Sequence, residues 1–290
     1  MADPLPICYL NGEFVALRDA RISPLDRGFL FGDSVYEVLP VFAGRMFRFL
    51  EHFDRLARSL GEIAIPSPHT HAQWLELLED LIRRNGGGDM YVYVQVTRGM
   101  EFGRNHAFPE HVSPAVFAMA APLPTLTPEL RRKGLSAITV EDFRWGRCDI
   151  KTTALLANVL IKQKAAEAGA QEAIIVRNGE VLEGSSSSVF LVLSGAVVTP
   201  PNSRSILPGT TRDAAVELAE GAMPIQIRRI SLDELRAASE VWISAATRDV
   251  VPVTTIDGRP VGEGKPGPVW LRMNSLFNEL RTRLAGTRAM

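Results

Sequence analysis

The first third of the chain alternates between strand-like and helix-like patterns of apolar residues. Ile7–Leu10 and residues 14–17 flank Asn11-Gly12, a dipeptide typical of a tight hairpin turn. Ser34–Phe42 and residues 91–98 (YVYVQVTR) are rich in β-branched and aromatic residues, which favours strands. Between these two runs, apolar residues recur three and four positions apart, the period of an amphipathic helix. They fall at Leu50, Phe53, Leu56, Ala57 and Leu60, and again at Trp74, Leu75, Leu78, Leu81 and Ile82.

A proline-rich segment over residues 120–128 (AAPLPTLTP) precedes a second series of elements. After it the pattern predicts a strand over residues 137–140 and a helix over residues 153–168. Residues 172–200 hold β-branched runs broken by Asn178-Gly179 and Ser194-Gly195, which is typical of an antiparallel meander. A helix over Thr210–Glu220, a strand over residues 240–244 and a helix near residues 269–284 follow. We therefore expect an α+β protein with domains at 1–119 and 129–290 and a linker over 120–128.

The composition is that of an ordinary folded protein. The 290 residues are 46% hydrophobic and 22% charged, and the formal net charge is −1, which argues against disorder and against a nucleic-acid partner. No apolar run approaches the roughly twenty residues of a membrane span, and the N-terminus lacks a signal-peptide pattern. The two cysteines, Cys8 and Cys148, make neither a disulfide framework nor a paired zinc motif. We expect a cytoplasmic protein without a metal site or a membrane partner.

Lysines are scarce, so an amine nucleophile has few candidates. Four of the five lie in segments that predict solvent-facing positions: Lys133, Lys162, Lys164 and Lys265. Lys151 differs, because it stands between Arg147-Cys148-Asp149-Ile150 and a predicted apolar helix. A lysine at such a junction can project into a cleft, where desolvation lowers its pKa and frees the amine for a Schiff base. A solvated lysine near a helix start is the more ordinary alternative.

Three further segments carry polar groups that suit binding. Gly209-Thr210-Thr211 opens a predicted helix, whose free N–H groups and hydroxyls make either an anion site or a simple threonine N-cap. Glu183 ends a strand before a serine-rich turn that either faces a ligand or only links two strands. Arg104 and His106 alternate along an extended segment, as a carboxylate trap requires, although a solvated loop has the same composition. Together with Lys151, these pieces describe a pyridoxal-phosphate enzyme acting on amino acids.

In their order along the chain, these pieces resemble the fold-type IV pyridoxal-phosphate aminotransferases, from about Tyr9 to about Gly262. The matching strings include Asp26-Arg27-Gly28, Phe31-Gly32-Asp33, Val35-Tyr36-Glu37-Val38, Asp54-Arg55-Leu56, Gln95-Val96-Thr97-Arg98-Gly99, Arg104-Asn105-His106, Arg147-Cys148-Asp149-Ile150-Lys151, Glu183-Gly184-Ser185-Ser186-Ser187 and Thr211-Arg212-Asp213. The resemblance implies a two-domain α+β fold. A smaller N-terminal α/β domain and a larger C-terminal domain with an antiparallel β meander would enclose the site between them.

The resemblance also implies how pyridoxal 5′-phosphate would be bound. Lys151 would hold it as an aldimine and, once displaced by substrate, move the proton between the substrate α-carbon and cofactor C4′. Glu183 would pair with the pyridine nitrogen. Arg55 would bind the phosphate. Without the resemblance, its position four residues after Glu51 on a predicted helix would indicate only a surface ion pair between the two. Further cofactor contacts are implied for Ser186, Leu207, Thr210, Thr211 and Ala245.

The substrate end is most similar to family members that act on D-amino acids, on the evidence of Tyr36, Val38, Arg104 and His106. Tyr36, Arg104 and His106 would bind the α-carboxylate, the last two from the partner subunit of a homodimer. The implied reaction is ping-pong transamination between D-amino acids and 2-oxo acids, such as D-alanine plus 2-oxoglutarate. The alternatives are a branched-chain L-amino acid or (R)-amine transaminase, and aminodeoxychorismate lyase. A protein that bound the cofactor without catalysis would have no use for a carboxylate trap at Arg104 and His106, which argues against that alternative.

Overall fold

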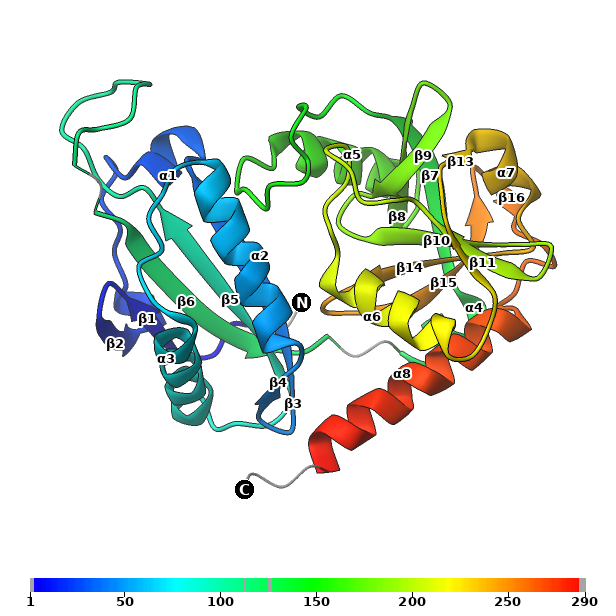
Figure 1. The fold of residues 1–290 in the computed structure, drawn as a ribbon, viewed down its shortest axis with the longest axis horizontal. Coiled ribbons are helices and arrows are strands. Elements are labelled where there is room, and N and C mark those ends of the chain that lie inside the picture. The colour runs from blue at the N-terminus through cyan, green and yellow to red at the C-terminus, as the bar shows by residue number, and fades with distance from the viewer. Residues whose placement is uncertain (1–2, 112, 125–126, 287–290) are drawn as a thin grey trace. The chain divides into compact units, whose positions relative to one another are not determined.

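The computed structural model describes residues 3–111, 113–124 and 127–286, and the chain divides into two compact units (Figure 1). The first unit comprises the chain up to Pro124, together with Ile150–Ala154 and the chain from Leu284 on. The second comprises Thr125–Asp149 and Leu155–Arg283. The short segment that contains Lys151 is therefore part of the first unit, although the chain on either side of it belongs to the second.

The first unit contains a six-stranded sheet in the order β2-β1-β6-β5-β3-β4, with antiparallel neighbours throughout. Its strands are β1 (Ile7–Leu10), β2 (Glu13–Ala16), β3 (Ser34–Phe42), β4 (Arg45–Met46), β5 (Met90–Thr97) and β6 (Ala115–Pro122). The hairpin predicted at Asn11-Gly12 is confirmed, with positive φ at both turn residues. The segment expected as a linker from residue 120 begins inside β6. The sequence pattern did not predict this strand, because β6 is rich in alanine, which is a weak strand former.

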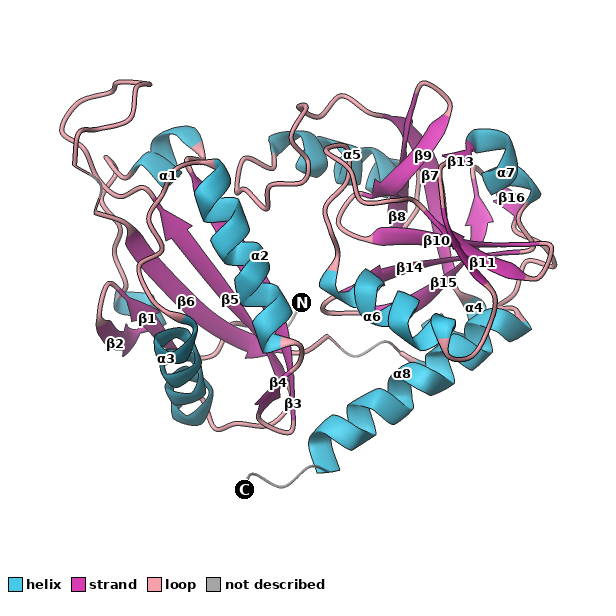
Figure 2. Cartoon of the chain, in the orientation of Figure 1, coloured by secondary structure: helices cyan, strands magenta, loops and turns pink. Residues whose placement is uncertain are grey.

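Two helices cover one face of this sheet, α2 (Phe49–Glu62) and α3 (His71–Arg84) (Figure 2). Most of their apolar residues join those of β3, β5 and β6 in a single buried cluster, whereas Ala57 and Leu75 of the predicted stripes are exposed. Leu50 departs from the predicted apolar stripe: it is 61% exposed, because it lies in the first turn of α2 and faces away from the sheet. Two short helices complete the unit, η1 (Leu17–Asp19) and α1 (Arg27–Phe31).

The second unit contains a ten-stranded sheet in the order β12-β11-β10-β14-β15-β7-β8-β9-β13, with β16 paired to β15. The strands are β7 (Leu135–Glu141), β8 (Glu172–Arg177), β9 (Glu180–Gly184), β10 (Ser188–Leu193), β11 (Ala196–Thr199), β12 (Ile225–Ile227), β13 (Ile230–Ser231), β14 (Glu240–Ala245), β15 (Asp249–Ile256) and β16 (Arg259–Pro260). The hairpins expected at Asn178-Gly179 and Ser194-Gly195 are formed. In contrast to a simple meander, β9 and β10 are not neighbours in the sheet order.

The helices of the second unit are α4 (Pro128–Lys133), α5 (Leu156–Glu167), α6 (Thr210–Glu220), α7 (Leu232–Ala237) and α8 (Pro268–Gly286). The bounds of α6 match the prediction, and α5 begins three residues later than expected from the sequence. The start of α8 is capped by the buried carboxylate of Glu240, which accepts from the N–H groups of Val269 and Trp270. Among the described residues, no helix combines the length and the hydropathy that a bilayer span requires.

Candidate active site

Lys151 lies in a short non-helical segment that pairs with the start of β3. Its carbonyl accepts a hydrogen bond of 3.0 Å from the Tyr36 N–H, and its own N–H donates to the Ser59 hydroxyl. The Lys151 Nζ lies 4.3 Å from the centroid of the Tyr36 ring, close enough for a cation–π interaction. This pairing explains the late start of α5, since Thr152 forms a bridge with Val35 and the Thr153 N–H donates to the Ser34 carbonyl. The structure thus brings together two residues that the sequence analysis selected separately.

Arg55 turns inward from α2 and forms a bidentate ion pair with Glu37 on β3. Arg55 Nε and Nη2 lie 2.7 and 2.8 Å from the two Glu37 oxygens, and the Nδ1 atom of His52 lies 2.8 Å from Glu37 Oε2. Burial opposes the ionisation of Glu37, but the charge of Arg55 and the hydrogen bonds from Arg55 and His52 outweigh it and keep its pKa far below the usual range. Burial lowers the pKa of His52, so the neutral ring donates from Nδ1. Glu51, the alternative partner of Arg55, pairs with Arg48.

The predicted substrate residues of β3 lie on one face of the sheet, where Tyr36 packs against a second tyrosine. Tyr36 and Val38 are two positions apart and share a face, opposite to the core residues Val35 and Leu39. The Tyr36 ring stacks on that of Tyr93 with centroids 5.6 Å apart. Burial raises the pKa of Tyr93, whose hydroxyl stays protonated and donates to the Gln95 side chain.

Arg104 and His106 are exposed on the loop between β5 and β6, and both contact the ring of Phe31 on α1. The guanidinium carbon of Arg104 lies 5.1 Å from the Phe31 centroid, and the His106 ring lies 5.3 Å from it. Phe31 is thus a contact that the two predicted substrate residues have in common. The sequence analysis assigned no role to Phe31.

Glu183, at the end of β9, is buried with both oxygens engaged. One oxygen accepts from Arg144 at 2.5 Å, and the other accepts from the Leu207 N–H at 3.1 Å. Burial opposes the charge of Arg144, but Asp142 and Glu183 outweigh it and raise its pKa above the usual value. Arg144 is therefore a fixed cation beside Glu183. The bond to Leu207 brings two of the predicted cofactor residues together in the second unit.

The serine-rich turn after Glu183 is held from inside by Glu172, the first residue of β8. Glu172 is 0% exposed and accepts hydrogen bonds from the Ser185 hydroxyl, the Ser187 hydroxyl and the Ala173 N–H. Ser186, the predicted cofactor contact, is exposed between its two buried neighbours. The turn therefore presents Ser186 outward on a rigid base.

The N-terminus of α6 is not closed by a threonine N-cap, and the anion site stays a prediction. The N-cap residue is Gly209, and Thr210 and Thr211 occupy the first turn of the helix, so neither is the cap. The first N–H groups of a helix have no acceptor within the helix, and glycine offers no side chain to supply one. A Cβ atom at Gly209 would come 2.7 Å from the Ser188 hydroxyl, so this position has little room for another residue. Ala245, the remaining predicted cofactor contact, ends β14 and is half-buried.

Among the buried carboxylates that had no role in the sequence-based predictions, Glu37 and Glu172 each carried a recognisable signal. Glu37 falls on the apolar face of β3, between Val35 and Leu39, where the strand's alternation predicts a hydrophobic residue. Glu172 opens the continuous apolar run EAIIV. A lone carboxylate at a core position requires a fixed partner, because burying an unpaired charge is costly. Arg144 carried no comparable signal.

The model of the family "Amino-transferase class IV" matches residues 34–256. This chain belongs to the class IV aminotransferases. The family predicted from the sequence is thereby confirmed. The chain is 40% identical over 279 residues to a D-alanine aminotransferase of Bacillus licheniformis, which covers 96% of this chain and 98% of that protein. It is 38% identical over 273 residues to a D-alanine aminotransferase of Staphylococcus haemolyticus, at 93% and 96% coverage.

Solved structures of this class have the same fold. The branched-chain amino acid aminotransferase from Escherichia coli superposes with a TM-score of 0.88 at 28% identity, covering 99% of this chain and 97% of that chain. The T.th. branched-chain amino acid aminotransferase, solved with pyridoxamine 5′-phosphate, gives a TM-score of 0.89 at 28% identity, covering 97% and 95%. The expected α+β fold of the fold-type IV enzymes is confirmed.

Proposed function

We propose that this class IV aminotransferase is a D-amino acid transaminase, which moves an amino group between D-amino acids and 2-oxo acids. The observation that carries the substrate assignment is the pairing of Arg104 with His106 around Phe31, in a chain whose curated relatives are D-alanine aminotransferases. Two cationic-capable side chains on one loop, both in contact with Phe31, suit the α-carboxylate that every amino acid and 2-oxo acid carries.

Each unit carries residues of the kind that bind pyridoxal 5′-phosphate, the cofactor of this enzyme. When bound, it supplies an electron sink for the amino acid α-carbon. Lys151, on the first unit, would provide the amine that holds the cofactor, and its Nζ would move a proton to and from the substrate α-carbon. Glu183, on the second unit, holds the proton of the pyridine nitrogen, and Arg144 keeps Glu183 in place.

The phosphate end combines charge with backbone N–H groups. The N-terminus of α6, with Thr210 and Thr211, offers donors and the positive end of a helix dipole. Ser186 adds a hydroxyl from its outward-facing position. Arg55 supplies positive charge, and Glu37 sets its orientation. Because Glu37 already neutralises part of that charge, we expect the helix terminus to contribute much of the phosphate affinity.

Substrate spectroscopy with the cofactor-loaded protein tests the assignment. Adding D-alanine should remove the visible absorption band of the cofactor, whereas L-leucine should leave it unchanged. Lys151→Ala should lose turnover by about a thousandfold or more, and the exposed Lys133→Ala serves as its control. Loss of the band with L-leucine alone would favour a branched-chain L-amino acid transaminase, and with an (R)-amine alone an (R)-amine transaminase. Release of pyruvate and 4-aminobenzoate without an acceptor would identify a lyase.

We further propose that the enzyme is a homodimer in which Arg104 and His106 complete the site of the partner subunit. Support comes from the loop between β5 and β6, where both residues are exposed beside the strongly exposed aromatic rings of Phe102 and Phe108. Large exposed apolar side chains are typical of interaction surfaces. The cytoplasmic location expected from the sequence stays a prediction.

A hybrid dimer tests this sharing of sites. One tagged chain carries Lys151→Ala and the other carries Arg104→Ala, and the doubly tagged hybrid is purified. If Arg104 serves the partner, one of the two sites in the hybrid is intact, so activity at low D-alanine should be about half that of the wild type. If Arg104 serves its own chain, the hybrid should be no more active than the Arg104→Ala protein. A monomer in light scattering would also refute the proposal.

A further inference from the structure

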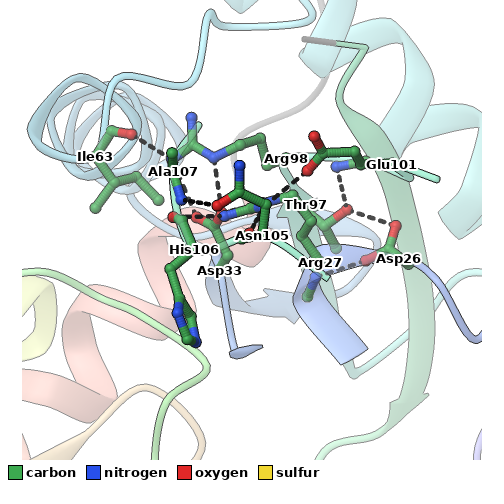
Figure 3. A network of polar contacts seen from close by, with 12 residues as sticks. Asp26, Arg27, Asp33, Ile63, Thr97, Arg98, Glu101, Asn105, His106 and Ala107 are labelled. Carbon is green, nitrogen blue, oxygen red and sulfur yellow. Dashed lines mark hydrogen bonds and ion pairs between the residues drawn. The ribbon is translucent and has the colours of Figure 1, made fainter. Parts of the chain in front are cut away.

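The loop that carries Arg104 and His106 is held by a buried cation beneath it. Arg27, the first residue of α1, is 3% exposed, and its guanidinium donates to the carbonyls of Asn105 at 2.6 Å and His106 at 3.2 Å (Figure 3). It also contacts the Glu101 carboxylate at 3.0 Å and the Asp33 carboxylate at 2.9 Å. Three of these four partners belong to the loop, so one side chain determines the position of its backbone.

The base of the loop is closed by the same helix. The Arg27 N–H donates to the carbonyl of Gly99, and the Asp26 carboxylate accepts from the Thr97 hydroxyl at 2.8 Å. Gly99 has a φ of +93°, and a Cβ atom there would lie 2.0 Å from the carbonyl oxygen of Ser113. The two ends of the loop therefore approach each other as closely as glycine permits, and α1 fixes the point where the loop departs.

The guanidinium of Arg27 is itself held in one orientation. Its partner Asp33 also binds Arg98, whose Nε and Nη2 lie 2.7 and 3.0 Å from the carboxylate oxygens. Arg98 is buried and donates to the carbonyls of Ile63 and Ala64. Burial opposes the ionisation of Asp33, but hydrogen bonds from Arg98 and Arg27 outweigh it and keep its pKa below the usual value. A fixed anion thus orients Arg27 toward the loop.

The loop's side chains are positioned by the other end of α1. Phe31 lies one turn beyond Arg27, on the same side of the helix, and the Arg27 guanidinium carbon is 4.9 Å from its ring centroid. Arg104 and His106 contact that same ring. Arg27 binds the backbone carbonyls and Phe31 supports the side chains, so α1 sets both the place and the direction of the two cationic groups.

We propose that Arg27 is a positioning residue for carboxylate recognition: it holds the loop so that Arg104 and His106 meet the substrate carboxylate in one geometry. This inference rests on the proposed function, in which that pair binds the carboxylate. A planar guanidinium can serve several acceptors in fixed directions, whereas the ammonium of lysine cannot reproduce that fork. Arg27→Lys therefore keeps the buried charge and removes the geometry.

The first experiment does not depend on activity. Hydrogen–deuterium exchange of the cofactor-loaded enzyme should show amides of residues 100–108 exchanging about tenfold faster in Arg27→Lys, with α2 and α3 unchanged. Arg21→Lys is the matched control, because Arg21 is exposed and donates only to the nearby carbonyls of Arg18 and Ala20 among the contacts of the described chain. Unchanged exchange in the loop would overturn the inference, whatever the enzyme's activity.

The second experiment is kinetic. Arg27→Lys should raise KM for D-alanine by about tenfold and change kcat by less than about twofold, because the lost interaction is one of binding. In an Arg104→Ala, His106→Ala background, Arg27→Lys should have no further effect on KM, since the groups that it positions are gone. An effect of undiminished size in that background, or a fall in kcat at constant KM, would show a general structural role and overturn the inference.

Arg104→Ala, measured in parallel, distinguishes failure of the positioning role of Arg27 from failure of the carboxylate trap itself. If Arg104→Ala raises KM and Arg27→Lys does not, the carboxylate trap stands and the positioning role is wrong. If neither substitution changes KM, the proposed trap itself is wrong, and the positioning role falls with it.

Discussion

The loop after β5 and the turn after β9 are held by buried charges of opposite sign. In the first unit, Arg27 binds main-chain carbonyls of the loop, and the cationic side chains of Arg104 and His106 remain outside. In the second unit, Glu172 binds serine hydroxyls and an N–H, and Ser186 remains outside. The sign of the buried charge thus selects which groups of a loop face inward, and it thereby determines what the loop presents to a ligand.

The buried side chains of Arg27 and Glu172, here called the two anchors, also differ in how their own charge is compensated. Arg27 has a carboxylate partner, Asp33, at hydrogen-bond distance. The cations nearest to Glu172 among its described contacts, Lys162 and Arg248, lie 3.7 Å from its oxygens, so its neutral donors carry most of the stabilisation. A buried charge that depends on hydroxyl and N–H donors is stable only while all of them are in place. We therefore expect the two anchors to respond differently to substitution.

The largest effect is expected at Glu172. Glu172→Ala removes the acceptor of Ser185, Ser187 and Ala173 together, and it leaves the two nearby cations uncompensated, so the free energy of unfolding should fall by about 3 kcal/mol. Urea denaturation of the cofactor-loaded protein measures the loss, and weaker binding of pyridoxal 5′-phosphate should accompany it. Glu167→Ala, on the exposed face of α5, is the control.

Glu172→Gln separates the charge from the hydrogen bonds. The amide keeps one acceptor, so its cost should be smaller, about 1 to 2 kcal/mol. If the free energy of unfolding of Glu172→Ala falls by less than about 0.5 kcal/mol, the serine-rich turn does not depend on Glu172, and the contrast drawn between Glu172 and Arg27 is wrong.

An intermediate effect is expected at Asp33. Asp33→Asn keeps the shape but weakens the bonds to Arg27 and Arg98, and it should lower the free energy of unfolding by about 2 kcal/mol at neutral pH. The pKa of Asp33 is lowered in the folded state, so its contribution is complete above the unfolded value of 3.8 and is lost as the pH falls from there through the folded value. The gap between wild type and variant should therefore close in acid. A gap that is constant with pH would contradict the ionised Asp33.

The smallest effect is expected at an exposed ion pair. Arg236 and Asp233 lie three residues apart on α7, with most of both side chains in solvent. Arg236→Ala should change the free energy of unfolding by no more than about 0.5 kcal/mol, because water screens the pair and ordering two long side chains costs entropy. A loss as large as that of Glu172→Ala would mean that ion pairing as such, rather than burial, distinguishes the anchors.

Elements with local start and stop signals were predictable from the sequence. α6 begins after Gly209 and ends before Gly221, and its bounds agree with the prediction. β3 was likewise bounded by its β-branched run. Elements that depend on distant partners could not be predicted in this way. The pairing of Thr152 with Val35 of β3 prevents the first turn that was expected for α5. β6 forms in an alanine-rich segment because β1 and β5 flank it.

The family could be identified from the sequence, because residue types and their order encode it directly. The same information selected Lys151 and three polar segments as candidates for the site. The partner of each buried charge could be found only from the folded chain: Arg55 binds Glu37, and Arg27 binds the carbonyls of Asn105 and His106. Main-chain carbonyls are the same at every position, so no sequence pattern marks those that a distant arginine will bind. The partners of these buried charges are therefore a property of the fold.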